Sequence, residues 1–169
     1  MAKMSDEPLS DQPLSDETMA SIRNCAKDAV SILGPKYASA VPATVVEAVD
    51  EFAYRWQKGK RPPAEVVEDT DTARLIFGSL WGEQLVKQFS WEWAKVNFSD
   101  GSVAFGVVSP DRSLVIYPLD FMLGCMQDPG VDVAVALSFN MLVAGSLPKM
   151  KRRSYTNVME GVHRIVPRD

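Results

Sequence analysis

Apolar residues recur at helical spacing through the first half of the chain and predict three helices. The first is expected over residues 15–33, with Ser15 as its N-cap. The second is expected over residues 42–57, before the sequence KGKRPP, whose prolines cannot continue a helix. The third is expected over residues 70–89, and it has little polar face, which is typical of a helix buried between layers.

The stretch of residues 91–118, WEWAKVNFSDGSVAFGVVSPDRSLVIYP, predicts a small sheet. Runs rich in valine and aromatic residues are separated by SDGS, which suits a tight hairpin, and by SPDRS, which suits a longer turn. Strands are therefore expected over residues 91–98, 103–108 and 114–117, joined as an antiparallel meander.

The remainder of the chain predicts two further helices and a last strand. A short helix is expected over residues 118–127. In residues 131–145 strand alternation and helical periodicity both fit, but the length and the Asp128-Pro129 capping signal favour a helix. A last short strand is expected within residues 155–166. The predicted fold class is α+β, with a three- to four-stranded antiparallel meander packed by about five helices.

Both faces of the predicted sheet are apolar, so each face needs a cover: helices, a second copy or a partner protein. One face carries Ala104 and Gly106 and is expected to accept the helix 70–89, whose Gly78 and Gly82 indicate a close approach. The other face carries Trp91, Trp93 and Phe105, and it is the better candidate for a surface covered by a partner. A core simply rich in tryptophan is the commoner arrangement and stays open as the alternative.

The first 14 residues differ in composition from the rest of the chain. They are acidic and contain two prolines, and the sequence PLSD occurs at residues 8–11 and again at residues 13–16, so we expect a disordered acidic leader over residues 1–14. The remaining residues, 15–169, have the length of a single α+β domain.

Charge is unevenly distributed along the chain. The sequence EVVEDTD concentrates four acidic residues: Glu65, Glu68, Asp69 and Asp71. The sequence KMKRR at 149–153 is basic, and we interpret it as a solvated turn after a helix. A pI of about 5.1 and the lack of interleaved aromatic residues make nucleic acid an unlikely partner.

Candidate catalytic groups are few. The single histidine, His163, would have to pair with Cys25 or Cys125, and both cysteines lie in apolar helical patterns, so no catalytic pair is expected. No metal-ligand spacing or cofactor motif is present, and we expect no metal or cofactor. The chain shows no signal peptide and no apolar run of ~18 residues, which predicts a cytoplasmic protein without a membrane partner.

Three segments, LWGEQLVKQFSWEW, GVVSPDRSLVIYP and VALSFNMLVAG, resemble small uncharacterised bacterial proteins of the immunity-like or domain-of-unknown-function type. In those proteins a GE-containing helix precedes a short meander that ends in a tyrosine- or phenylalanine-proline pair. The resemblance covers about residues 70–145. It implies a cytoplasmic bacterial protein with no catalytic site, sometimes encoded beside a toxin.

Two classes of function remain open on the sequence. The first is an immunity-type inhibitor that blocks a toxin, and its expected binding residues are Glu65, Glu68, Asp69, Asp71, Trp91, Trp93 and Phe105. The second is a small-molecule-binding or enzymatic domain with a cleft between the sheet and the first two helices. The expected lining of that cleft is Glu83, Glu92, Trp93 and Tyr117. A homodimer through the tryptophan face is a third alternative.

Overall fold

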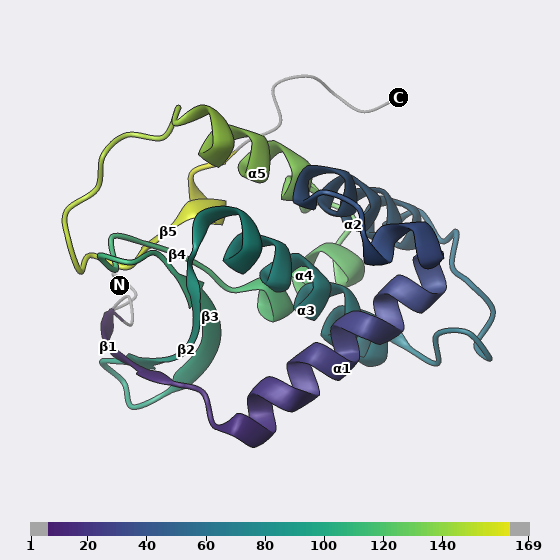
Figure 1. Ribbon diagram of the computed structural model, residues 1–169, viewed down its shortest axis with the longest axis horizontal. Helices are drawn as coiled ribbons and strands as arrows, with labels where there is room; N and C mark the ends of the chain where they lie inside the picture. The colour runs from purple at the N-terminus through teal and green to yellow at the C-terminus, as the bar shows by residue number, and fades with distance from the viewer. Residues whose placement is uncertain (1–6, 163–169) are drawn as a thin grey trace.

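The computed structural model describes residues 7–162 and has an α+β fold, as predicted (Figure 1). The α-helices within these residues are Asp16–Leu33 (α1), Pro42–Gln57 (α2), Thr70–Phe89 (α3), Pro118–Gln127 (α4) and Val135–Ala144 (α5). The strands are Pro8–Pro13 (β1), Glu92–Phe98 (β2), Val103–Val108 (β3), Leu114–Ile116 (β4) and Thr156–Asn157 (β5). Short 3₁₀ helices occupy Pro35–Ala38 and Val158–Glu160.

Side-chain caps place the starts of two helices where the sequence predicts them. The Ser15 hydroxyl accepts a hydrogen bond from the Thr18 backbone N–H (3.1 Å), and the Asp69 carboxylate accepts one from the Thr72 N–H (2.8 Å). The segment 131–145 is helical, but only from residue 135. Asp128 does not cap it, because its carboxylate accepts the N–H of Gly130 in the preceding turn (2.8 Å).

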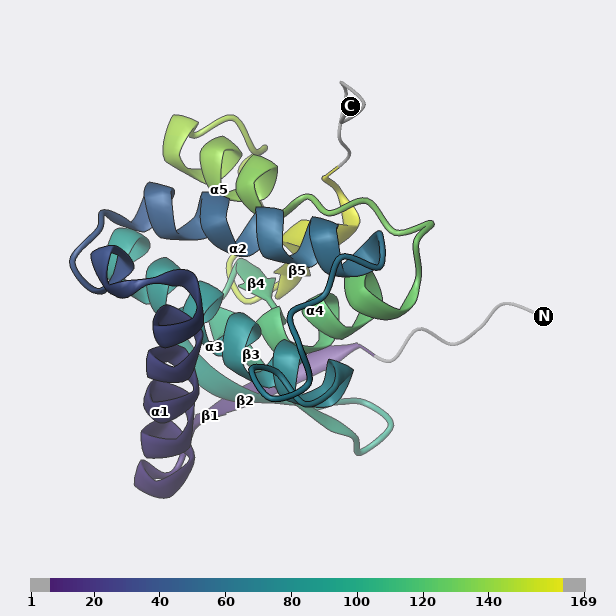
Figure 2. The same cartoon turned by 90° about the vertical axis from the view of Figure 1, so that its right-hand side faces the viewer.

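The helix α2 supplies the groups that hold α5 and the loop before it. The buried Asp50 carboxylate accepts the N–H of Ala136 in the first turn of α5 (2.9 Å), where α5 has no cap of its own. The Gln57 amide donates to the carbonyls of Cys125 and Val131 (3.0 and 2.7 Å). Figure 2 shows the result, with α2 lying between α5 and the pair formed by α3 and α4.

The sheet is larger than predicted and it is mixed. Its order is β1-β2-β3-β4-β5, and β5 runs parallel to β4, so an antiparallel meander of three or four strands describes only part of it. The strand β1 also corrects the prediction of a disordered leader, because residues 8–13 pair antiparallel with β2. An edge strand with little burial can be polar, and low hydrophobicity therefore did not exclude it.

The helix α3 covers the tryptophan face of the sheet, and the prediction that it would lie on the face of Ala104 and Gly106 is wrong. Trp93 packs against α3 at Gly82, where an added Cβ would overlap the indole ring. Gly78 instead lets the start of α4 approach, since an added Cβ would lie 3.0 Å from Leu119 Cα. Both glycines thus mark close contacts of α3, as expected, but the contacts are with the Trp93 ring and with α4.

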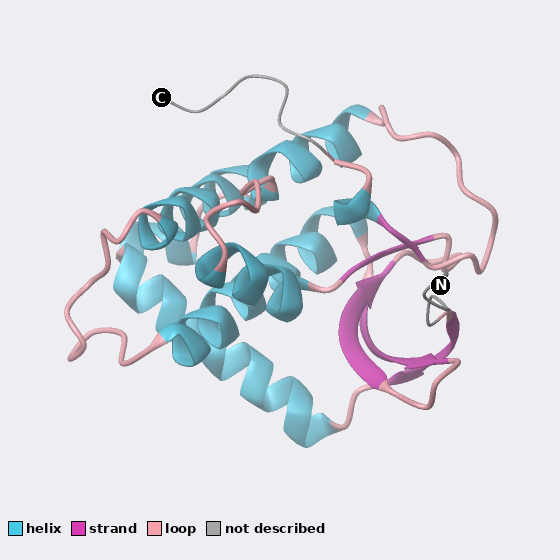
Figure 3. Cartoon of the chain, turned by 180° about the vertical axis from the view of Figure 1, so that it is seen from behind, coloured by secondary structure: helices cyan, strands magenta, loops and turns pink. Residues whose placement is uncertain are grey.

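The opposite face of the sheet is covered by the sheet itself. The strands curl (Figure 3) and enclose a small second core. Its members are Ala94, Val96, Phe98, Val108, Val115, Tyr117 and Tyr155. Most of each face is therefore covered within one chain, and the apolar second face does not by itself require a partner protein.

A charged contact closes the curl between β1 and the opposite end of the sheet. The Asp11 carboxylate accepts two hydrogen bonds from the Arg112 guanidinium (3.2 Å each) and one from the Tyr155 hydroxyl (2.6 Å). Arg112 and Tyr155 both have positive φ (59° and 45°), and the Tyr155 N–H donates to the Arg112 carbonyl (2.9 Å). Three segments distant in sequence thus meet at one carboxylate.

Candidate functional site

The four predicted acidic residues are exposed in the loop before α3 and in the first turn of that helix, and ion pairs connect the last of them to Asp120. Glu65 and Glu68 are exposed in the loop before α3, and Asp71 is exposed in the first turn of that helix. Arg74 links Asp71 (3.0 Å) to Asp120 at the start of α4 (3.9 Å). We call this the acidic surface, formed by Glu65, Glu68, Asp69, Asp71 and Asp120.

The acidic residues of this surface do not have equal roles. Asp69 caps α3, and hydrogen bonds from the Thr72 backbone and side chain hold its pKa below the ordinary value of a carboxyl group. Asp71 pairs with Arg74. Within residues 7–162, Glu65 and Glu68 form no ion pair and cap no helix, so they can be changed without removing a helix cap.

The loop that carries Glu65 and Glu68 contains a hydrogen-bonded turn and one buried side chain. The backbone N–H groups of Val66 and Val67 both donate to the Pro63 carbonyl (2.8 and 3.1 Å), which forms a tight turn. The Val67 side chain is 2 % exposed and packs in the main core, while Val66 is 51 % exposed. Val67 therefore anchors the loop, and Val66 stands beside two exposed carboxylates.

The tryptophan face is not a surface. Trp91 and Trp93 are each 6 % exposed and belong to the main helical core, so they cannot form the expected contact with a partner. The core alternative is the correct one, and a homodimer through these side chains is excluded for the same reason. Phe105 lies on the same face of the sheet but is only half-buried, opposite Lys95 in the β2–β3 register.

The residues expected to line one cleft lie in three places. The Glu83 carboxylate, on α3, accepts the indole N–H of Trp93 (3.0 Å). Glu92 is exposed at the start of β2, where its carboxylate lies 3.6 Å from Arg112. Tyr117 lies on the other face of the sheet and borders a hollow of about 260 Å³ with Phe98. The predicted cleft is therefore absent from the described residues.

A different groove lies beside Glu83. It runs between α1 and α3, has a volume of about 510 Å³, and is bordered by Arg23, Lys27 and Lys87. These cations were not among the residues predicted from the sequence. A local signal was available, because Arg23 and Lys27 are one helical turn apart on α1, next to the small Ala26.

The thiols do not have the environment of nucleophiles. Burial raises the pKa of the Cys125 thiol to about 12, and burial also raises the pKa of Cys25, so both are protonated at neutral pH. His163 lies outside the described residues. Within residues 7–162, no group of three or more potential metal ligands is found.

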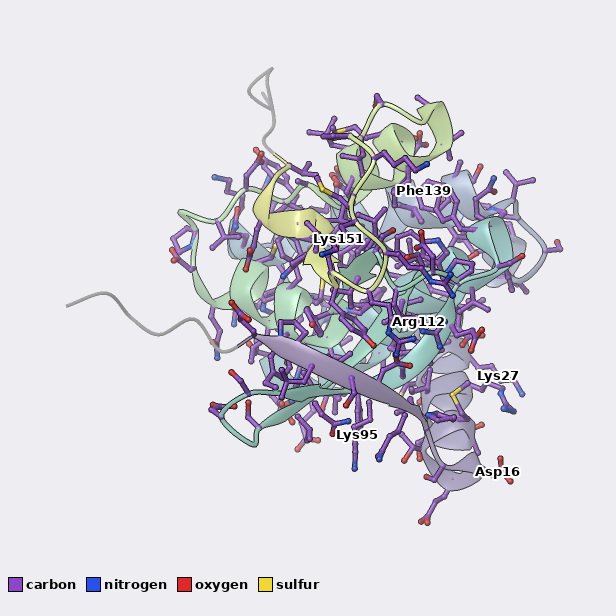
Figure 4. The ribbon with its side chains drawn as sticks, turned by 90° about the vertical axis from the view of Figure 1, so that its left-hand side faces the viewer. Asp16, Lys27, Lys95, Arg112, Phe139 and Lys151 are labelled. Atoms are coloured by element: carbon purple, nitrogen blue, oxygen red, sulfur yellow. The ribbon has the colours of Figure 1, made fainter. Side chains whose placement is uncertain are left out.

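The basic residues at 149–153 form an exposed loop after α5, as the solvated-turn interpretation predicts, and Figure 4 shows Lys151 within it. None of the helices described over residues 7–162 combines the length and apolarity needed to cross a membrane. Comparison of the chain with family models, with curated proteins and with solved structures finds no match.

Proposed function

We propose that the protein is a non-catalytic, cytoplasmic interaction protein of the immunity type, which binds a basic partner such as a toxin through the acidic surface. The observation that carries the proposal is the anchored loop before α3. Along this loop the exposed Val66 follows Glu65 and precedes Glu68, both of which are exposed, while the buried Val67 holds the backbone in place.

A loop fixed in this way supports binding for three physical reasons. Little conformational entropy is lost on association, because the turn is already formed in the free protein. Exposed carboxylates attract a basic partner over a distance of about one Debye length, which raises the association rate at low salt. An apolar side chain between the carboxylates adds contact area that is independent of salt.

The acidic surface also supports the expectation, implied by the resemblance to immunity-like proteins, that the partner is a toxin. Enzymes that act on nucleic acids present basic substrate channels, and an acidic inhibitor competes for such a channel by charge complementarity. The extension to Asp120 widens the surface beyond the loop.

The test reverses the charges of Glu65 and Glu68, which cap no helix. The tagged native protein and the variant E65K/E68K are used to capture proteins from lysate of the source cells at low salt and at high salt. The control is D28K/E47K, which makes the same change in net charge at exposed positions on α1 and α2.

We expect the native protein and the control to capture one stoichiometric basic partner, and E65K/E68K to lose it. With that partner purified, the association rate of E65K/E68K should fall at least about tenfold at low salt, and the partner's activity should no longer be inhibited. Equal capture by E65K/E68K, or no captured partner at all, would overturn the proposal.

A further inference from the structure

The groove between α1 and α3 has the size of a small-molecule site. Its volume of about 510 Å³ lies within the range of about 300–1,000 Å³ that is usual for such sites. Its lining includes two small side chains, Ala26 on α1 and Ala38 in the following 3₁₀ helix, together with Leu80 and Gln84 on α3.

The walls of the groove are aliphatic rather than aromatic. Ala26, Val30 and Leu80 provide apolar surface, and none of the described residues that line the groove has an aromatic ring. Flat heteroaromatic ligands usually stack on such rings, so this lining favours an aliphatic chain. Gln84 adds one polar atom, because its Nε2 donates to the Leu80 carbonyl (3.2 Å) while its buried Oε1 has no partner among the described residues.

The rim of the groove is cationic. Arg23, Lys27 and Lys87 border it, and none of them forms an ion pair with an acidic residue within 7–162. Figure 4 shows Lys27 projecting from the side of α1. The described lining has three cations against one acidic residue, Glu83, so it carries an excess of positive charge, and the Glu83 carboxylate accepts the Trp93 indole N–H.

We propose that this groove binds an amphipathic aliphatic carboxylate, with the chain along Ala26, Val30 and Leu80 and the carboxylate at the lysines. The aliphatic walls select the chain by burial of apolar surface, and the cations select the charged end. This site is separate from the acidic surface, and its occupancy does not depend on the proposed protein partner.

The test measures binding of octanoate, below the concentration at which it aggregates, by titration calorimetry. Octanol, which has a chain of the same length but no charge, is the control ligand. The variant K27Q/K87Q should bind octanoate about two- to thirtyfold more weakly, the combined effect of two exposed charges, with octanol binding unchanged. The control K60Q/K151Q removes two exposed lysines elsewhere and should bind octanoate as the native protein does.

A second variant tests the location of the ligand. Ser31 lies at the groove on an exposed position of α1, so Ser31→Phe should block the groove and abolish binding of both ligands. Ser21→Phe, at another exposed position of α1, should not. The indole N–H resonance of Trp93, assigned through Trp93→Phe, should shift when octanoate is added, because Glu83 joins this group to the groove.

Absence of saturable octanoate binding would overturn the proposal. An equal loss of affinity for octanoate and for octanol in K27Q/K87Q would also overturn it. Binding of octanoate by Ser31→Phe with the affinity of the native protein would do the same. The variant E65K/E68K should bind octanoate normally, which separates failure of this site from failure of the acidic surface.

Discussion

Removal of the Asp11 charge should release β1 from the curled sheet. The Asp11 and Arg112 side chains are only 8 % and 19 % exposed, and the carboxylate receives hydrogen bonds from Arg112 and Tyr155. Loss of one partner from a buried ion pair costs about 3–5 kcal/mol, because the other charge stays buried without compensation. Arg112 keeps Glu92 at 3.6 Å and the Ser109 carbonyl at 3.3 Å, so we expect a lower cost.

We therefore expect Asp11→Asn to lower the free energy of unfolding by about 2–3 kcal/mol, which corresponds to a fall in Tm of about 4–12 °C for a chain of this length. Urea denaturation followed by circular dichroism measures the first quantity. The control is Asp28→Asn, an exposed change on α1 that should stay within about 0.5 kcal/mol of the native value. Hydrogen exchange should show faster exchange at the β1–β2 backbone hydrogen bonds in Asp11→Asn.

The effect should also depend on pH. Burial by itself would raise the pKa of Asp11, but hydrogen bonds from Arg112 and Tyr155 outweigh it and hold the pKa below its ordinary value of about 3.9. A carboxylate whose pKa is lower in the folded state stabilises the fold above its unfolded pKa, and this contribution is lost as pH falls through the folded pKa. The stability difference between native protein and Asp11→Asn should therefore be full at pH 6 and shrink below about pH 4. A difference under about 0.5 kcal/mol at pH 6 would refute the role of this contact.

Three further changes test the packing of the two cores, each by urea denaturation. Gly82→Ala should destabilise by about 1–3 kcal/mol despite the better helix propensity of alanine, because its Cβ would overlap the Trp93 ring; a gain in stability would contradict this packing. Tyr117→Phe should be neutral or stabilising by up to about 1 kcal/mol, since the buried hydroxyl has no hydrogen-bond partner among the described residues. A clear loss of stability in this variant would show that the hydroxyl does have a hydrogen-bond partner. Glu83→Gln keeps an acceptor for the Trp93 N–H and should cost less than Glu83→Ala by about 1 kcal/mol; equal losses would discount this hydrogen bond.

The helices could be predicted well because their signals are local. Ser15 and Asp69 cap helices through bonds to residues three positions away, and the apolar spacing within each helix needs no knowledge of the rest of the chain. The start of α5 was less well predicted for the opposite reason. Its cap comes from Asp50, which is 86 positions away along the chain.

The alternation of side chains predicted which residues share a face, but it carried no information on what covers that face. Trp91 and Trp93 were correctly grouped, while the choice of α3 as their cover depended on contacts with Gly82 that alternation cannot reveal. The sequence already contradicted the predicted cleft, since the same alternation places Trp93 and Tyr117 on opposite faces of the sheet. Two side chains on opposite faces cannot line one cleft.

The position of Asp11 changes the argument about function. A polar leader with no predicted role supplies the carboxylate that joins β1 to Arg112 and Tyr155, and the curl that results buries the second face of the sheet. A partner is therefore not needed to cover apolar surface. The hypothesis of an interaction protein therefore no longer rests on the tryptophans and rests on the acidic surface. There, charge and a fixed loop would provide the specificity of binding, rather than exposed hydrophobic area.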